Sequence, residues 1–138
     1  MTAILPPLFI QIGLTFVVCF LMAGFRVMES VRDPKVSTAV QQGRSDVYGR
    51  TATLLSDNLK NQFEFPILFY AAVLLAVATG SVSDHLVTLA WVFALARVGH
   101  ALVHCTLNIV ALRFVVFGVS LFALLFMWLH LFQTTLGA

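Results

Sequence analysis

The sequence has little charge. Only 10% of its 138 residues are Asp, Glu, Lys or Arg, whereas 60% are hydrophobic. A typical soluble domain carries about 25% charged residues, so this composition excludes an ordinary soluble domain. The mean hydropathy of +0.97 is typical of a chain that crosses a membrane several times.

Cysteine is also scarce, since only Cys19 and Cys105 are present, each inside an apolar segment. Two distant cysteines predict neither a disulfide framework nor a zinc site, and we interpret both as packing residues. The net charge is only +2, and no basic run is interleaved with aromatic residues. Nucleic acid is therefore not expected as a partner. The first apolar run lacks a positive leader and is too long for a signal peptide, so we interpret it as a retained helix.

Long apolar runs predict the fold. A transmembrane helix needs about 20 residues, and four runs approach or exceed this length, at 8–25, 59–79, 85–108 and 113–132. The two later links are short, which makes the neighbouring helices antiparallel. The sequence therefore predicts an all-α, integral membrane, up-down four-helix bundle that forms a single domain over residues 1–138.

The basic residues predict the orientation. The segment 26–60 carries six of the eight Lys and Arg residues, and the link 80–84 carries none. The excess of Lys and Arg in cytoplasmic loops places this long first loop in the cytoplasm, with Arg113 on the same side. Both termini then lie outside, and we expect a multi-pass protein of the bacterial inner membrane surrounded by membrane lipids.

A polar stripe runs along the third predicted helix. At about 100° per residue, Arg97, His100, His104 and Asn108 fall within about 80° of one another. Each ionisable group in the hydrocarbon core costs at least ~2.5–3.5 kcal/mol on insertion scales. Such residues must be paired, hydrated or used, so the stripe is the first candidate for a functional site.

A second stripe opens the second predicted helix, where Asp57, Asn61 and Glu64 share one face and Pro66 follows. A proline inside a helix removes a backbone donor and kinks the helix, here just below the polar residues. With a rise of about 1.5 Å per residue, Glu64 lies level with the two histidines, and the long Arg97 side chain reaches it. We therefore predict an ion pair between Glu64 and Arg97.

Each of these residues also has a structural interpretation. The ion pair would lock two helices together, and the asparagines are common hydrogen-bonding residues between membrane helices. The i, i+4 spacing of His100 and His104 suits a metal, but few carboxylates and no aligned cysteine accompany it. We therefore predict no metal site and interpret the histidines as hydrogen-bonding groups. Arg113 lies close enough to the interface to extend its side chain to the lipid headgroups.

At these residues the sequence resembles a known family, the membrane-associated proteins in eicosanoid and glutathione metabolism (MAPEG), especially its short bacterial members. The first matching patch is Asn61-x-x-Glu64-x-Pro66. The second patch is Ala96-Arg97-x-x-His100-x-x-x-His104-x-x-x-Asn108-x-x-x-x-Arg113-x-x-x-Phe117-Gly118. The four-span layout agrees, so the resemblance covers essentially the whole chain.

The resemblance implies a homotrimer that binds glutathione as its cofactor between neighbouring subunits, open to the cytoplasm. It implies that Arg113 is catalytic and stabilises the glutathione thiolate. Asn61 and Glu64 would help to hold the tripeptide. Arg97, His100 and His104 match polar positions of that pocket.

Three functions follow from the residues and the resemblance. The first is a membrane-bound glutathione transferase or peroxidase that acts on lipophilic electrophiles or lipid hydroperoxides. The second is a non-catalytic scaffold or an accessory subunit of a larger membrane complex. Two positions favour it: Asp57 stands where glutathione-using members carry arginine, and Phe117 where they carry an aromatic hydroxyl. The third is a proton or ion pathway along Glu64, Arg97 and the histidines.

Overall fold

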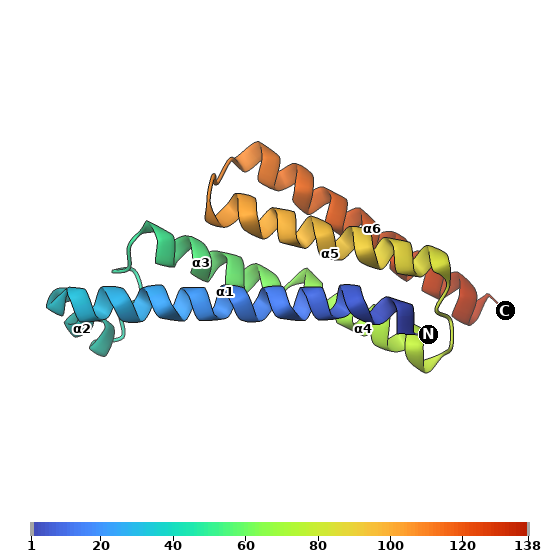
Figure 1. The fold of residues 1–138 in the computed structure, drawn as a ribbon, viewed down its shortest axis with the longest axis horizontal. Helices are drawn as coiled ribbons and strands as arrows, with labels where there is room; N and C mark the ends of the chain where they lie inside the picture. The colour runs from blue at the N-terminus through green and yellow to red at the C-terminus, as the bar shows by residue number, and fades with distance from the viewer. Residues whose placement is uncertain (1, 138) are drawn as a thin grey trace.

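The computed structural model describes residues 2–137, and every regular element within them is a helix (Figure 1). A single 3-10 turn precedes six α-helices. In chain order the elements are η1 (Thr2–Ile4), α1 (Leu5–Arg32), α2 (Pro34–Gln41), α3 (Arg50–Gln62), α4 (Phe65–Ala78), α5 (Asp84–Cys105) and α6 (Val110–Leu136).

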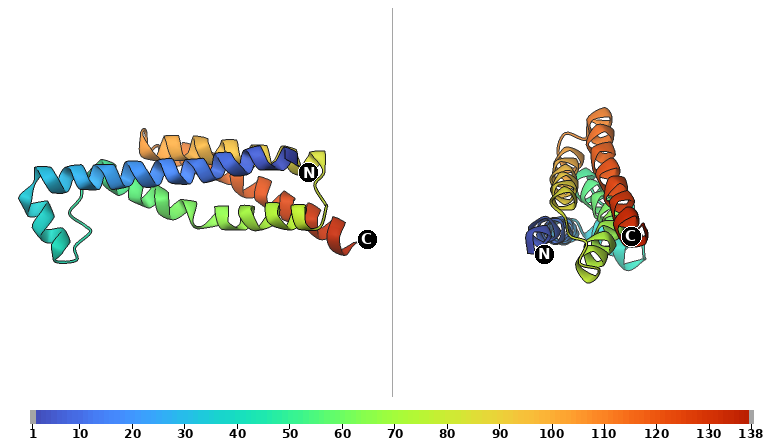
Figure 2. Two further views of the ribbon diagram at one scale, coloured as in Figure 1. Left: turned by 60° about the horizontal axis from the view of Figure 1, so that its bottom comes forward. Right: turned by 90° about the vertical axis from the view of Figure 1, so that its right-hand side faces the viewer.

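Four stretches are long and apolar enough to cross a membrane, namely Thr2–Arg32, Arg50–Ala78, Asp84–Cys105 and Val110–Thr135. They alternate in direction, and both ends of the chain lie at the same end of the bundle (Figure 2). The predicted fold class is therefore confirmed, because the chain is an all-helical, multi-pass, up-down bundle.

The apolar core fills the half of the bundle that contains the chain ends. There α4 packs against α6, and α6 packs against α5. The Phe69 and Phe93 rings stack with their centroids 4.3 Å apart. The buried cluster consists of Ile4, Phe69, Ala72, Val73, Ala76, Leu86, Ala90, Phe93, Ala123, Leu124, Met127 and Leu131. Since aliphatic and aromatic groups fill this half, the buried polar groups gather in the other half.

The second span is broken rather than merely kinked. We predicted one helix over 59–79, but α3 ends at Gln62 and α4 begins at Phe65. The proline ring at Pro66 clashes with the carbonyl four residues earlier, which belongs to Gln62. Glu64, between the two helices, has φ −92° and ψ −101°, outside helical geometry. This break exposes the last carbonyls of α3 in the middle of the bundle.

Two other helix ends differ from the prediction. The third helix was expected to reach Asn108, but α5 ends at Cys105, and Asn108 lies in the link at φ 49°. Asn is one of the few residues that tolerate this left-handed conformation. The first helix continues past Arg26 to Arg32, because the membrane surface does not stop a helix and the next proline is Pro34.

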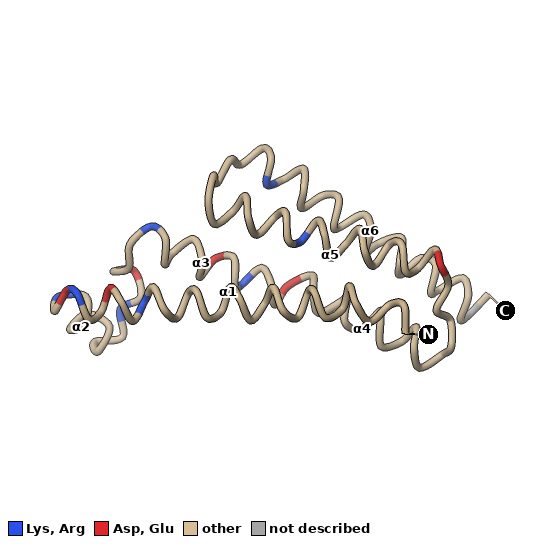
Figure 3. Tube along the Cα trace, viewed as in Figure 1, with Lys and Arg blue, Asp and Glu red and all other residues tan. Residues whose placement is uncertain are grey.

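Charged side chains gather at the end of the bundle formed by α2 and the adjoining ends of α1 and α3 (Figure 3). The segment 26–60, which was predicted as a loop, is largely helical in the structure. The exposed Arg44 Nη2 lies 2.9 Å from Asp46 Oδ2. The hydrogen bond from Arg44 lowers the pKa of the Asp46 carboxyl. This end is the polar face of an otherwise apolar molecule.

Ser83 joins two helices at the opposite end. Its hydroxyl accepts a hydrogen bond from the Leu86 amide and lies 2.9 Å from His130 Nε2 on α6. Replacing an N-cap serine by alanine costs about 1 kcal/mol. We expect Ser83→Ala to lower the unfolding free energy by about that amount, measured by denaturant titration in detergent. Ser81→Ala is the control and should change stability little, because Ser81 caps no helix.

Candidate functional site

A polar cavity lies where the break in the second span faces α5 and the start of α6. Its volume is about 160 Å³, and its lining consists of Asn61, Glu64, His100, Arg113, Phe114 and Phe117. Four of the six residues predicted for a site therefore line one cavity. The other two, Arg97 and His104, are buried on α5 and are not part of this lining.

Arg113 stands in the first turn of α6. Its guanidinium Nη1 donates a hydrogen bond of 3.1 Å to the side-chain oxygen of Asn108. The left-handed backbone of Asn108 turns the chain between α5 and α6. One hydrogen bond leaves most of the donors of a guanidinium available, so Arg113 presents a partly free cation to the cavity.

Glu64 and Arg97 do not form the predicted ion pair. The described residues contain two salt bridges, Arg44–Asp46 and Lys60–Asp57, and Glu64 is in neither. Instead, Arg97 Nη2 donates to the backbone carbonyl of Asn61 at 2.7 Å. The prediction was wrong because it assumed a continuous helix. A helix end leaves carbonyls without intrahelical partners, and the broken α3 offers one to the guanidinium.

Arg97 is the largest fully buried side chain, with an exposed fraction of 0%. Its Nε and Nη1 atoms have no hydrogen-bond partner within residues 2–137. A buried cation with donors unused is costly in a membrane protein. A charged group kept at this cost indicates a site nearby, although Arg97 itself is not in the lining of the polar cavity.

His100 and His104 are buried beside each other, with their rings in edge contact at a centroid distance of 5.7 Å. The His100 ring also lies 5.8 Å from that of Phe117. Both Nδ1 atoms lack a partner in the described part of the chain. No cluster of three or more potential metal ligands occurs among the described residues. His100 lines the cavity, whereas His104 contacts the ring of His100 without lining the cavity.

A chain of buried amides joins α1 to α3 and was missed by the sequence analysis. Gln11 Nε2 donates to Gln62 Oε1 at 2.8 Å, and Gln62 Nε2 donates to Asn58 Oδ1 at 2.9 Å. All three side chains are buried. The sequence did contain a sign of this network, because Gln11 carries the single side-chain amide in the first apolar run. These hydrogen bonds between amides fix α1 beside the break that exposes Glu64.

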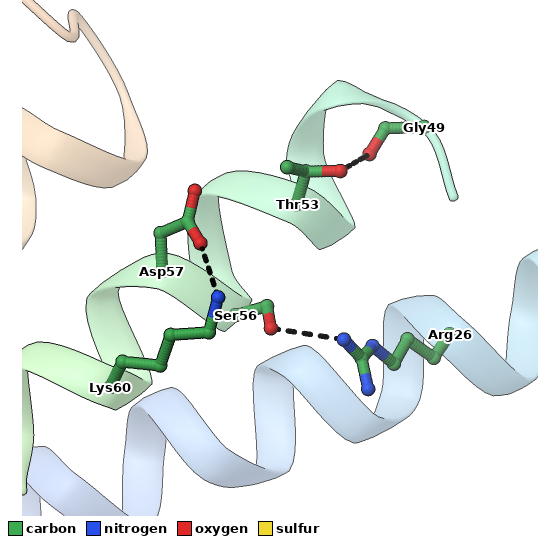
Figure 4. A network of polar contacts seen from close by, with 6 residues as sticks. All are labelled: Arg26, Gly49, Thr53, Ser56, Asp57 and Lys60. Atoms are coloured by element: carbon green, nitrogen blue, oxygen red, sulfur yellow. Dashed lines mark hydrogen bonds and ion pairs between the residues drawn. The ribbon is translucent and has the colours of Figure 1, made fainter. Parts of the chain in front are cut away.

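A second group of polar contacts lies between α1 and α3 (Figure 4). Arg26 Nη2 donates to Ser56 Oγ at 2.9 Å. Lys60 Nζ lies 3.0 Å from Asp57 Oδ1. The Asp57 carboxylate, which the sequence analysis singled out, is thus partly neutralised by a neighbouring ammonium. This contact reduces its repulsion of an anion.

Comparison with known proteins decides the family. The sequence pattern that describes the MAPEG family matches residues 4–133 of the chain. The chain belongs to the MAPEG family. The match to MAPEG extends over nearly all of the four spans and includes every residue of the cavity. No curated protein and no solved structure matches the chain.

Proposed function

We propose that this MAPEG protein is a membrane-bound glutathione transferase or peroxidase that acts on lipophilic electrophiles or lipid hydroperoxides. One observation carries the proposal: Arg113 lines a single cavity together with three polar residues and with two phenylalanines, Phe114 and Phe117. A cation suited to a thiolate thus adjoins a surface suited to an apolar substrate.

The residues fit the chemistry of glutathione. The exposed Glu64 carboxylate suits the ammonium of the tripeptide, and the Asn61 amide suits a peptide group. A nearby cation lowers the pKa of a thiol and so generates the nucleophilic thiolate. Arg113 is the cation available in the cavity for this role. The salt bridge between Lys60 and Asp57 limits the repulsion of the glutathione carboxylates.

Two balanced reactions are open to such a thiolate. In conjugation, a sulfur–carbon bond forms, the leaving group departs with its electron pair, and the thiol proton passes to water. In peroxide reduction, two thiols are oxidised to a disulfide while the hydroperoxide is reduced to an alcohol and water. In both reactions Arg113 would hold the sulfur, and the phenylalanines would face the apolar reactant.

The size of the cavity favours a site shared between subunits. Its 160 Å³ is below the range of about 300–1,000 Å³ for complete small-molecule sites. We therefore propose that a neighbouring subunit completes the binding site, within the homotrimer that the resemblance to MAPEG proteins implies. We also propose that the charged end faces the cytoplasm of a bacterial inner membrane. Glutathione would then enter from the aqueous side, and the electrophile from the lipid.

Titration calorimetry of glutathione into the detergent-purified protein tests this function. We expect micromolar-to-millimolar binding, and a loss of at least about tenfold in affinity for Arg113→Ala, because a charge-assisted contact contributes about 1.5–3 kcal/mol. Arg32→Ala removes a distant arginine and should bind like the parent. Absence of binding at high glutathione, or equal binding by Arg113→Ala, would contradict the proposal.

One observation favours a second candidate, a non-catalytic scaffold or an accessory subunit of a larger membrane complex. Phe117 lines the cavity, and its ring cannot donate a hydrogen bond to a thiolate. This alternative predicts stable co-purification with other membrane proteins and no thiol chemistry. Mass spectrometry of the protein extracted in mild detergent distinguishes the scaffold from the enzyme, because only the scaffold is expected to carry other membrane proteins with it.

A further inference from the structure

A second cavity lies between α1 and α4, away from Arg113. Its volume is about 370 Å³, and its lining consists of Leu8, Ile12, Thr15, Phe16, Tyr70 and Leu74. No residue lines both cavities. This α1–α4 groove is apolar except for two hydroxyl groups, which belong to Thr15 and Tyr70.

The hydroxyl pair lies near the middle of the membrane. Thr15 is 10 residues after Leu5, where α1 begins, and 11 before Arg26, the first charged residue of α1, which places it roughly 15–17 Å from each end of the uncharged part of this helix. The hydrocarbon core is about 30 Å thick, so this position is close to its centre. Membrane tyrosines usually lie at the interface, where their hydroxyls contact water and headgroups. At this depth the Tyr70 hydroxyl can contact neither water nor lipid headgroups.

The Tyr70 hydroxyl is poorly satisfied. Its partner within residues 2–137 is Thr15 Oγ1 at 3.5 Å, well beyond the usual 2.7–2.8 Å of a hydrogen bond between hydroxyls. The Thr15 hydroxyl lies 3.1 Å from the Gln11 carbonyl, to which it donates. Because the hydrocarbon core offers no water to an unused donor, the groove presents a hydrogen-bond donor without a proper acceptor.

We propose that the α1–α4 groove binds an uncharged, lipid-soluble carbonyl compound of the quinone class, whose carbonyl oxygen accepts a hydrogen bond from Tyr70. The walls bear no charge, which excludes an ionic ligand at this depth. The ester carbonyls of phospholipids lie near the headgroups and do not reach the membrane centre. A wholly apolar carbonyl compound does reach it, and its body packs against side chains such as Phe16 and Leu74.

The test uses decylubiquinone titrated into the purified protein, with infrared detection of the quinone carbonyl. We expect saturable binding and a shift of the carbonyl stretch to lower frequency. Tyr70→Phe removes only the hydroxyl and should weaken binding by about tenfold, the loss expected for one hydrogen bond. It should also abolish the shift. Tyr48→Phe, which alters the other of the two tyrosines, is the matched control and should behave like the parent.

A second variant keeps the test decisive if Tyr70→Phe folds poorly. Leu74→Trp adds bulk at an exposed wall of the groove and should prevent quinone binding while Tyr70 remains. Glutathione binding by this variant should be unchanged, which separates this site from the Arg113 cavity. Equal quinone binding by the parent, Tyr70→Phe and Leu74→Trp would overturn the proposal. So would a photo-reactive group at position 74 that couples to a second copy of the chain instead of the quinone.

Discussion

Replacing Arg113 by alanine is expected to lower the rate of thiol conjugation by at least about a hundredfold, the usual loss when one donor to a developing anion is removed. The assay follows release of chloride from a chlorodinitrobenzene by glutathione in proteoliposomes. The fold should survive, because Arg113 is half-buried and makes one hydrogen bond, to Asn108. The reaction should recover at high pH, where the thiol ionises without help.

Two variants make this result specific. Arg113→Lys keeps the charge but loses the planar fork of donors, so its rate should fall between those of the parent and the alanine variant. Arg44→Ala removes an exposed arginine that pairs with Asp46, and its rate should equal that of the parent. A parental rate in the folded Arg113→Ala protein would remove this residue from the mechanism and favour the scaffold function.

Gln62→Leu is expected to produce the largest loss of stability, about 2–4 kcal/mol, because it leaves two buried groups unsatisfied at once. Gln62 accepts from Gln11 and donates to Asn58, and its own exposed fraction is 1%. Leucine fills a similar volume, so lost hydrogen bonds rather than a cavity would dominate. The unfolding free energy in mixed detergent micelles, followed by circular dichroism, measures the effect.

A double-mutant cycle separates the interaction from general disruption of the helix. Gln11→Leu alone should cost less, about 1–2 kcal/mol, since Gln62 keeps its bond to Asn58. The double variant Gln11→Leu/Gln62→Leu should be more stable than the two single losses predict, because their shared bond is counted once. Strictly additive losses would show that the two amides act independently in the membrane.

The sequence predicted the architecture because bilayer thickness fixes helix length. Four apolar runs separated by short or charged segments allow few other arrangements. The stripe of Arg97, His100 and His104 was predicted to matter, and all three are buried in the bundle. Periodicity places residues on one helix face, and in a membrane a polar face must turn toward protein.

The contacts between helices could not be predicted from the sequence. Pro66 predicted a kink, but how far the helix opens depends on whether neighbouring groups can satisfy the freed carbonyls. At the break Arg97 donates to the carbonyl of Asn61, and Glu64 is left exposed instead of paired. Helical spacing gives the level of a side chain in the membrane and not its partner, which explains why the predicted ion pair was wrong.

By itself the sequence determined the number of spans, their antiparallel order and the polar stripe of Arg97, His100 and His104, since composition and periodicity are local properties. The tertiary structure alone decided that Asn61, Glu64, His100 and Arg113 line one cavity. It also decided that Gln11 bonds to Gln62 across two helices and that Tyr70 faces a separate groove. These outcomes depend on how helices rotate and pack against one another, which is a property of the whole bundle and of no single segment.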